Sequence, residues 1–308
     1  MAGNIQNVMT IGKSDIKASP LGVGTNRWFF NKTIDPGLGA TFKEAVASGI
    51  NFFDTAEIYG NGGSEKAVGE LIRQTKSKVI VASKFFPSPN RLTENSFQSA
   101  LRQTLDRLGL VQLDIYMLHF PFPPVKIETW MEYMANAVDA GLVKTVGISN
   151  CNKTQMKKAY DTLAKRNIPL ICNEVEFNLV KREPMRNGVL KYCQELGVTM
   201  IAYRPLTSGL LSGKYSTDTM PAMVRGQVFS KPQMKNWIPL LETVQRIADE
   251  QGKTTGQVAL NWVICKGANP IPGVTSPEHV KENAGAMDWR LSEKDMAALD
   301  EAGKGKTD

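Results

Sequence analysis

The sequence predicts an α/β fold, a (β/α)8 TIM barrel in which an N-terminal β-hairpin plugs the bottom. Eight short apolar runs alternate along the chain with segments of helical periodicity. The runs are apolar on both faces, which is typical of parallel strands in a covered sheet. The length of 308 residues suits a barrel, which commonly needs about 250 residues or more. No proline- or glycine-rich linker divides the chain, so we expect a single domain over residues 1–308.

The predicted elements follow one another at regular spacing. The strands are Leu21–Gly24, Asn51–Phe53, Val79–Ala82, Leu113–Leu118, Thr145–Ile148, Leu170–Val175, Val198–Ala202 and Asn269–Ile271. Helical periodicity covers Glu65–Arg73, Asn95–Leu108, Thr129–Ala140 and Asn187–Leu196, among others. Before them, Val8–Lys17 predicts the plugging hairpin. The segment Gly213–Trp237 has little periodicity, and we expect a long loop there of the kind that is usually functional or mobile.

Composition narrows the classes of partner. The net charge of +7 comes from 37 basic against 30 acidic residues, which are scattered along the chain. Such a balance suits a phosphorylated cofactor, but nucleic-acid binding needs a basic stripe with stacking aromatics, which is not found. No apolar run approaches the roughly 20 residues of a membrane span, and the first residues do not resemble a signal peptide. We therefore expect a cytoplasmic protein, a monomer or weak homo-oligomer, with no membrane or nucleic-acid partner.

The cysteines indicate neither a metal site nor a redox motif. Their spacing is about twenty residues or more, which fits no known metal-ligand or disulfide-exchange pattern. We expect reduced, mostly buried thiols and no metal. The four are Cys151, Cys172, Cys193 and Cys265.

Ionisable residues end three consecutive predicted strands. Asp54, Lys84 and His119 follow the second, third and fourth runs, and Tyr59 lies in the loop after the second. In a barrel the active site lies at the carboxyl ends of the strands, which are about 4.8 Å apart, so these groups are expected to converge. Alone, each has a structural interpretation, such as a helix cap or a hydrogen-bonded histidine. Their coincidence favours a catalytic site.

This set of side chains suits general-acid catalysis without a nucleophile or a metal. A free phenol has a pKa of about 10, and a neighbouring ammonium would lower it, so Lys84 is expected to lower the pKa of Tyr59. Asp54 would hold Lys84 in place and charged, while His119 would orient a substrate oxygen. Such a site protonates a carbonyl oxygen while another group, such as a nicotinamide hydride, attacks the carbon.

The later strand ends carry features of a nucleotide site. Ser149 and Asn150 end the fifth strand, Glu174 lies near the end of the sixth, and Tyr203 after the seventh offers a flat face for a ring. The small-residue segment Leu206–Lys214 follows the seventh strand, where barrels commonly bind phosphate.

The chain resembles the aldo-keto reductase superfamily from about residue 8 to about residue 302. The resemblance is carried by the motifs Asp54-Thr-Ala-Glu-Ile-Tyr-Gly60, Ser83-Lys84, Leu118-His-Phe-Pro121, Gly147-Ile-Ser-Asn150, Ala202-Tyr203 and Ile271-Pro-Gly273. It implies a catalytic tetrad of Asp54, Tyr59, Lys84 and His119 in an NADPH-dependent carbonyl reductase. It also implies cofactor contacts from Thr25, Ser149, Asn150, Glu174, Tyr203, Arg204, Leu206, Ser208, Leu210, Lys214, Gly273, Thr275, His279, Glu282 and Asn283.

Some of these positions depart from the family pattern. Glu174 stands where a glutamine is usual, and Arg204 stands where a serine often follows the tyrosine. We hypothesise an ion pair between Glu174 and Arg204, which lie on adjacent strands. Gly273 and His279 replace basic residues that many relatives place near the 2′-phosphate. We expect NADPH ahead of NADH, with NADH still open.

Aromatic residues are expected at the pocket mouth and favour a bulky or aromatic carbonyl compound as substrate. Trp237, in the long predicted loop, is a further candidate. The predicted substrate contacts are Trp28, Phe29, Phe120 and Phe122, with Phe30 beside them.

Two other functions stay open at this point. Lys84 at a barrel strand end could form a Schiff base, as in lysine-dependent aldolases. Some barrels of this family resemble channel-associated subunits that hold NADPH without turnover, so a non-catalytic NADPH-binding regulatory subunit is the second alternative.

Overall fold

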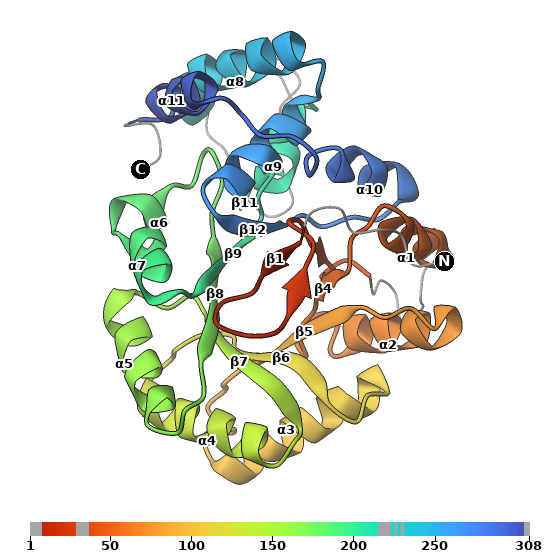
Figure 1. The fold of residues 1–308 in the computed structure, drawn as a ribbon, viewed down its shortest axis with the longest axis vertical. Coiled ribbons are helices and arrows are strands. Elements are labelled where there is room, and N and C mark those ends of the chain that lie inside the picture. Colours follow the sequence, from red (N-terminus) through yellow and green to blue (C-terminus); the bar gives the residue numbers. More distant parts are fainter. Residues whose placement is uncertain (1–7, 29–36, 215–222, 225–226, 229–230, 305–308) are drawn as a thin grey trace.

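Eight parallel strands close into a barrel (Figure 1). In this computed structural model, the structure describes residues 8–28, 37–214, 223–224, 227–228 and 231–304. The strands lie in the order β3 to β9, then β12, and pair in register from one to the next. The barrel closes where Gly22 and Gly24 donate to the carbonyls of Pro270 and Pro272, at 2.9 and 3.0 Å. The strands are β3 (Val23–Gly24), β4 (Phe52–Asp54), β5 (Ile80–Phe85), β6 (Leu113–Leu118), β7 (Val143–Ser149), β8 (Leu170–Glu176), β9 (Thr199–Tyr203) and β12 (Ala268–Ile271).

Helices cover the outside of the barrel (Figure 1). Several begin where the sequence supplies a capping side chain: Thr93, Asn152 and Thr254 each accept a hydrogen bond from the backbone three residues on. The helices are α1 (Gly37–Ala47), α2 (Gly63–Thr75), α3 (Glu94–Leu108), α4 (Ile127–Asp139), α5 (Lys153–Ala164), α6 (Glu183–Arg186), α7 (Val189–Leu196), α8 (Lys231–Gln251), α9 (Thr255–Cys265), α10 (Pro277–Ala284) and α11 (Glu293–Ala302).

The predicted barrel is confirmed, with small differences at the element ends. Strand β5 runs on to Phe85, so Lys84 lies inside the strand rather than after it. The helix expected over residues 187–196 begins two residues later, as α7 at Val189, and the separate short helix α6 precedes it. Gly188, which has a φ of 78°, lies between the two because a helix cannot continue through this left-handed conformation.

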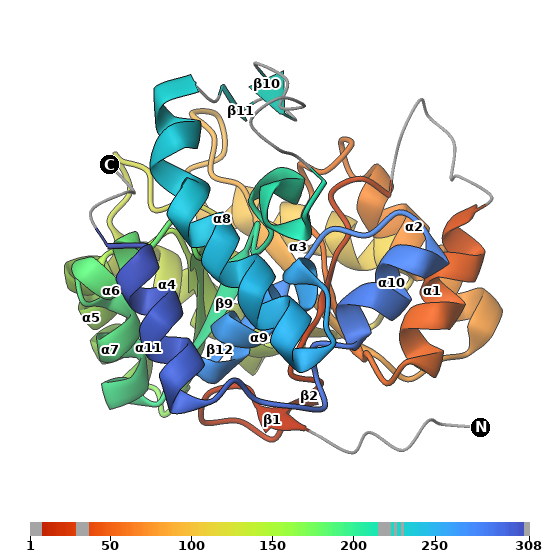
Figure 2. The same cartoon turned by 90° about the horizontal axis from the view of Figure 1, so that it is seen from above.

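The N-terminal hairpin closes the bottom of the barrel, as predicted. Strands β1 (Met9–Thr10) and β2 (Lys17–Ala18) pair antiparallel below the barrel (Figure 2). Gly12 donates to Thr199 Oγ1 at 2.8 Å, at the first residue of β9. A Cβ atom at Gly12 would lie only 2.3 Å from the carbonyl oxygen of Ile171, so a side chain there would push the hairpin off the barrel.

The barrel interior changes from apolar to polar along each strand. Side chains alternate between the two faces of a strand, so residues two apart point the same way. The inner cluster contains Phe52, Ala82, Cys172 and Ile201, packed against Ile11 of the hairpin. Two residues further along the same strands come Asp54, Lys84, Glu174 and Tyr203. An apolar floor therefore supports a polar layer at the carboxyl ends of the strands.

The long connection after β9 differs from the prediction. It contains the 3-10 helix η1 (Thr207–Ser212) and the hairpin β10 (Met223–Val224) with β11 (Gln227–Val228), and α8 already begins at Lys231. Pro232 indicated a loop, yet it is the second residue of this helix, where proline is tolerated. Trp237 is therefore a helical residue, 5% exposed in the core, and not a pocket-mouth residue. Residues 215–222, 225–226 and 229–230 lie outside the described part.

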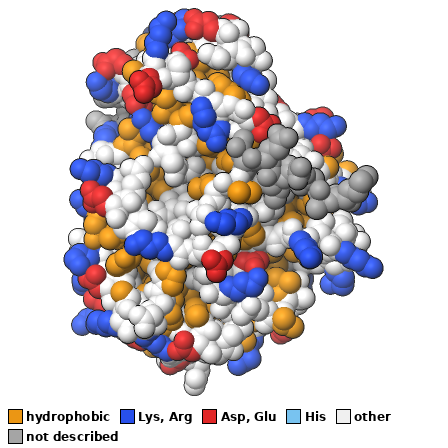
Figure 3. All heavy atoms as spheres, in the orientation of Figure 1, with side chains coloured by type: hydrophobic (Ala, Val, Ile, Leu, Met, Phe, Trp, Pro, Cys, Tyr) orange, Lys and Arg blue, Asp and Glu red, His pale blue; other side chains and the backbone are white. Residues whose placement is uncertain are grey.

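The surface of the hairpin face carries lysine and arginine interspersed with acidic residues rather than one basic stripe (Figure 3). Within the part of the chain that the structure describes, no helix has the length and apolar content needed to cross a membrane.

Candidate active site

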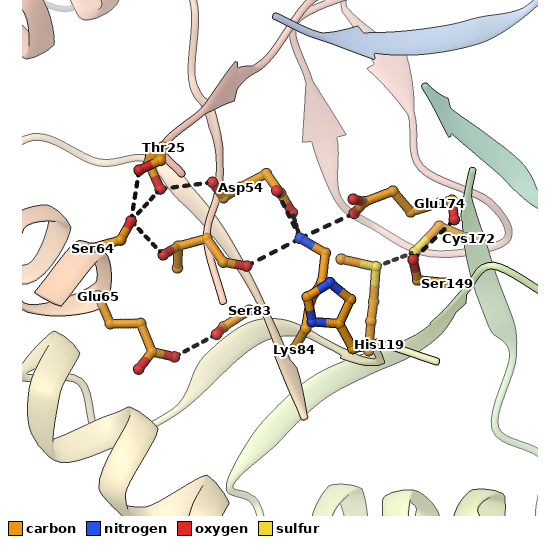
Figure 4. A network of polar contacts seen from close by, with 12 residues as sticks. Thr25, Asp54, Ser64, Glu65, Ser83, Lys84, His119, Ser149, Cys172 and Glu174 are labelled. Atoms are coloured by element: carbon orange, nitrogen blue, oxygen red, sulfur yellow. Dashed lines mark hydrogen bonds and ion pairs between the residues drawn. The ribbon is translucent and has the colours of Figure 1, made fainter. Parts of the chain in front are cut away.

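The lysine of strand β5 is held between two carboxyl groups inside the barrel (Figure 4). Lys84 Nζ donates to both oxygens of Asp54, at 2.6 and 2.7 Å, and to the carbonyl of Thr55 at 3.1 Å. Glu174 Oε2 lies 3.2 Å away on the other side. The ammonium group has no exposed surface, and neither carboxyl side chain is more than 2% exposed. The cluster therefore contains two acids and one base in a dry environment.

Burial and charge oppose one another in this cluster. Burial disfavours the ammonium of Lys84, but the charges of Asp54 and Glu174 outweigh it and raise its pKa, so the lysine stays charged. Burial raises the pKa of Asp54 against the opposing charge of Lys84. Burial and the neighbouring Asp54 charge raise the pKa of Glu174 to about 8. The protonation of the two carboxyl groups is therefore coupled to the charge of Lys84.

Tyr59 lies beside this cluster, as the sequence predicts, but its acidity differs from the expectation. Lys84 Nζ is 5.3 Å from the centre of the phenol ring. The pKa of Tyr59 is raised, not lowered, because burial outweighs the ammonium charge, and the carboxylates of Asp54 and Glu174 add to the rise. In this state the phenol keeps its proton throughout the physiological range, as a proton donor must.

His119 follows β6 and meets Tyr59 edge-on, with 6.0 Å between the ring centres. Burial and the charge of Lys84 lower the pKa of His119 to about 3, so the imidazole is neutral and carries one N–H. Its Nδ1 atom has no hydrogen-bond partner among the described residues, although it is buried. A buried polar atom without a partner is costly in a native fold, so this imidazole is suited to bind a molecule that enters the site.

A cavity of about 660 Å³ begins at these groups and extends along the later strand ends. The structure brings most of the predicted site residues to its wall, which includes Asp54, Tyr59, His119, Phe120, Ser149, Asn150, Glu174, Tyr203, Arg204, Leu206, Ser208, Lys214, Gly273, Thr275, His279, Glu282 and Asn283. Their grouping agrees with an elongated ligand.

Hydrogen bonds fix the middle of this wall. Tyr203 donates to Asn150 Oδ1 at 3.1 Å, and the amide of Asn150 donates to the carbonyl of His119 at 3.1 Å. Ser149 Oγ donates to the carbonyl of Glu174 at 3.0 Å. The bonds between Tyr203, Asn150 and His119 link the end of β9 to the end of β6, so a ring placed against Tyr203 would meet a preformed surface.

Five predicted side chains are absent from the cavity wall, and one of them is Lys84, which is enclosed by Asp54 and Glu174. Trp28 is fully buried against Phe42 and Phe53 and donates to the carbonyl of Val274 at 2.9 Å, so its assignment to the substrate pocket is wrong. The fully buried hydroxyl of Thr25 donates to the carbonyl of Asp54 at 2.8 Å. The other two are Leu210, which packs in the core, and Phe122, which is exposed outside the wall. Phe29 and Phe30 lie outside the described residues.

The hypothesised pair between Glu174 and Arg204 is also wrong. Glu174 faces the barrel interior and meets Lys84, whereas Arg204 Nη1 lies 3.9 Å from Glu176 Oε1. Asp54, Lys84 and Glu174 lie on the inner face because each is two residues beyond an inner apolar residue. Arg204 follows strand β9 instead and is 42% exposed at the cavity rim.

Sequence reasoning missed several wall residues and one support. Asn26 and Arg27 follow β3 and line the cavity, together with Gly24, Pro205, Gly209, Ser212, Ile271 and Pro272. Their place directly after the first predicted strand was the available signal for Asn26 and Arg27. Glu57 lies two residues before Tyr59, and its Oε1 accepts from the backbone N–H of Phe86 at 2.6 Å. It ties the loop of Tyr59 to the strand of Lys84.

The segment after β9 forms a turn that suits an anion. Thr207, Ser208 and Gly209 have consecutive positive φ angles of 48°, 56° and 100°. The N–H groups of Thr207 and Gly209 donate to the carbonyls of Arg204 and Leu206, at 3.0 and 2.9 Å, and so fix the shape of the turn. Ser208, Gly209 and Lys214 line the cavity, so a diphosphate fits the chemistry of this end. By contrast, no three His, Cys, Asp or Glu side chains in the described ranges gather as a metal site would require.

Comparison with known proteins decides the family. The model of the aldo/keto reductase family matches residues 20–304. The chain belongs to the aldo/keto reductase family. Within this family, chloroplastic pyridoxal reductase of Arabidopsis thaliana is 37% identical over 308 residues, which is 94% of this chain and 84% of that protein.

Solved aldo-keto reductases confirm the barrel. A thermostable aldo-keto reductase in complex with the inhibitor epalrestat superposes with a TM-score of 0.79 at 30% identity, covering 97% of this chain and all of that one. An aldo-keto reductase of Klebsiella pneumoniae in complex with NADPH gives 0.76 at 26% identity, covering 96% of this chain and 94% of that one. The family resemblance found in the motifs is therefore confirmed.

Proposed function

We propose that this aldo-keto reductase uses NADPH to reduce the carbonyl of an aldehyde or ketone to the alcohol, with imine reduction to an amine as a further possibility. The observation that carries the proposal is the buried Lys84–Asp54 pair beside a protonated Tyr59, at one end of an elongated cavity. NADPH-bound family members of this fold support the nicotinamide cofactor. NADH stays open as a weaker alternative.

The nicotinamide, when bound, supplies the hydride that forms the new C–H bond. Tyr59 gives its proton to the carbonyl oxygen as negative charge develops there, and solvent returns a proton to the phenolate afterwards. Lys84, kept charged by its hydrogen-bonded partner Asp54, stabilises that phenolate. Neutral His119 offers one hydrogen bond to the same oxygen and so orients the substrate.

The rest of the wall divides by chemistry along the cavity. Tyr203 offers a ring face, and Ser149 and Asn150 offer polar groups beside it for the nicotinamide. The loop of Ser208 with Lys214 would hold the diphosphate. The adenosine end would lie among Gly273, Thr275, His279, Glu282 and Asn283. Arg204 and Leu206 would contact the cofactor from the cavity wall, whereas Thr25 and Leu210 would contact it only through their backbone atoms.

Aromatic side chains favour an aromatic or bulky substrate. The rings of His119 and Phe120 stack with 4.9 Å between centres, and Phe122 stacks on Phe120 at the same separation. Phe86 packs edge-on against all three rings. This rigid platform leads from the catalytic histidine to the surface. The name of the Arabidopsis pyridoxal reductase supports an aromatic aldehyde among the substrates.

The Schiff-base alternative is less compatible with this site. An amine must lose its proton to attack a carbonyl, whereas the carboxyl groups around Lys84 raise its pKa.

A cytoplasmic location remains a prediction, since the Arabidopsis relative is named as chloroplastic.

A screen of aldehydes, ketones and imines with NADPH and NADH tests the proposal. We expect oxidation of NADPH with an aromatic aldehyde, and transfer of deuterium from 4-deuterated NADPH to the product carbon. Trapping of substrate on Lys84 by borohydride in the absence of cofactor would support the aldolase instead. Tight NADPH binding with no turnover across the panel would support a regulatory subunit.

A further inference from the structure

The second carboxyl group of the lysine cluster has no role in the reduction described above. Glu174 is 2% exposed, lines the cavity, and places Oε2 3.2 Å from Lys84 Nζ. That approach is not aligned as a hydrogen bond, and Oε2 has no hydrogen-bond partner among the described residues. Asp54 alone already neutralises Lys84. A fully buried, unneutralised carboxylate would be costly, so Glu174 must either be protonated or meet a positive charge.

Geometry indicates which carboxyl group holds the proton. Asp54 accepts from Lys84 through both oxygens, at 2.6 and 2.7 Å, as an ionised carboxylate does. Glu174 has only the single, poorly aligned contact. Burial and the nearby charge of Asp54 both raise the pKa of Glu174, which disfavours a second ionised carboxyl group in the same place. A protonated Glu174 offers an O–H donor beside an acceptor oxygen, whereas an amide side chain offers two N–H donors beside its oxygen.

We propose that Glu174 is protonated in the free enzyme and ionises when the oxidised cofactor binds, so that this residue sets the relative affinity for NADP+ and NADPH. The proposal rests on the proposed function, because it assigns a nicotinamide cofactor to the cavity. The single difference in charge between the two cofactors lies on the nicotinamide ring, which is positive in NADP+ and neutral in NADPH.

The reaction places that ring near Glu174. A carbonyl oxygen must lie within hydrogen-bond reach of Tyr59, and the hydride donor must lie about 3–3.5 Å from the carbonyl carbon. Tyr59 and Glu174 share Lys84 as a neighbour. At a separation of roughly 6 Å and an effective dielectric constant of about 20, a positive ring and an ionised Glu174 attract one another enough to change affinity on the order of 10- to 100-fold.

Five of the ionisable groups around Glu174 do not titrate between pH 6 and pH 9. Lys84 on β5 stays charged, and the pKa of Tyr59 in the loop after β4 is raised. The pKa of His119 beyond β6 is about 3, while that of Tyr203 on β9 is raised to about 12 by burial. On strand β8 itself, burial raises the pKa of Cys172 well above its usual value, and Glu176 lies two residues beyond Glu174. Asp54 on β4 is the coupled partner already described.

Calorimetric titration of the purified protein with NADP+ and with NADPH, in buffers of different ionisation enthalpy, tests the proposal. Near pH 7 we expect NADP+ to release about 0.5 to 1 proton more than NADPH. The 2′-phosphate also titrates, near pH 6, but it is present in both cofactors and cancels in the difference. From pH 6 to pH 9, the ratio of Kd for NADPH to Kd for NADP+ should rise by about tenfold or more.

Two variants identify the source of the proton. Glu174→Gln should bind both cofactors, release no extra proton with NADP+, and show a Kd ratio that changes less than about twofold with pH. Tyr59→Phe should retain the wild-type proton release, which excludes the phenol as its source. Equal proton release with both cofactors in the wild-type protein would overturn the proposal, even if Glu174→Gln failed to fold. Failure to bind either cofactor would instead refute the proposed function on which it rests.

Discussion

Lys84 Nζ contacts both oxygens of Asp54, at 2.6 and 2.7 Å, and the ammonium has no exposed surface. An isolated charge would not be stable in such a place, so each group depends on the other. The phenol of Tyr59 lies over the same ammonium. The buried pair that neutralises Lys84 therefore lies directly beside the proposed proton donor.

Replacement of Tyr59 by phenylalanine should separate chemistry from binding. The variant keeps the ring beside Lys84 and loses only the hydroxyl. We expect kcat to fall by about 10²- to 10⁴-fold, which is the usual contribution of general-acid catalysis. The dissociation constant of NADPH, measured by fluorescence titration, should stay within about twofold of the wild-type value. An unchanged kcat would assign the proton to another group.

Replacement of Lys84 by methionine should reduce stability as well as activity. It leaves Asp54 buried without its counter-ion, and breaking a buried pair in this way typically costs about 3–5 kcal/mol. We expect denaturant unfolding to show a loss of that order. Turnover should fall below detection because the phenolate then has no neighbouring positive charge.

A double-mutant cycle provides the control for this effect. Asp54→Asn with Lys84→Met removes both charges, so the double variant should be more stable than the sum of the two single losses predicts. Strict additivity of the unfolding free energies would mean that the two groups do not interact as the distances indicate.

Glu57 should support Tyr59 without touching substrate. Its Oε1 accepts from the backbone of Phe86 at 2.6 Å and its Oε2 pairs with Arg91 at 2.9 Å. Glu57→Ala leaves that N–H without its partner and frees the loop two residues before Tyr59. We expect kcat to fall about tenfold while NADPH affinity is retained, because small displacements of a catalytic group are costly. Arg91→Gln keeps the bond to Phe86, so its effect should be several-fold smaller.

Phe120 should select for aromatic substrates. It lines the cavity and stacks on His119, whereas Phe122 stacks behind it and is 45% exposed. Aromatic contacts are worth about 0.5–1.5 kcal/mol beyond burial, so Phe120→Ala should raise KM for aromatic aldehydes about three- to tenfold. Small aliphatic aldehydes should show little change. Phe122→Ala is the matched control, and an equal effect there would place the substrate outside the observed wall.

The barrel and the cluster of ionisable residues at its strand ends were predictable from local pattern. Short apolar runs that end in ionisable residues place Asp54, Lys84 and His119 at one end of a parallel sheet, and no long-range information is needed. The partner of Glu174 was predictable in principle from the same alternation, since Cys172 and Glu174 share the inner face of β8. The hypothesised ion pair with Arg204 was based on the two strands being neighbours, without regard to the face of the sheet on which each residue lies.

Other features depend on tertiary burial, which the sequence does not state. The loop after β3 turns back on itself, and the backbone N–H of Trp28 donates to the carbonyl of Thr25 at 2.9 Å. This turn places the indole of Trp28 in the core. Tyr59 shows the same limit. The effect of Lys84 on its pKa had the expected sign, but burial has the larger effect and reverses the net shift.

The pH dependence of stability tests the protonation of Glu174 without any cofactor. Its pKa is raised from 4.5 to about 8 by burial and by Asp54, so between these values the folded protein binds a proton that the unfolded chain releases. Its contribution to stability is therefore full below about pH 4.5, falls as pH rises, and levels off above about pH 8. We expect the wild-type protein to lose on the order of a few kcal/mol from this group across that window. In urea unfolding, the free energy of unfolding of Glu174→Gln should decrease by that much less across the same pH window. Identical pH profiles for the two proteins would mean that Glu174 is ionised in the folded state.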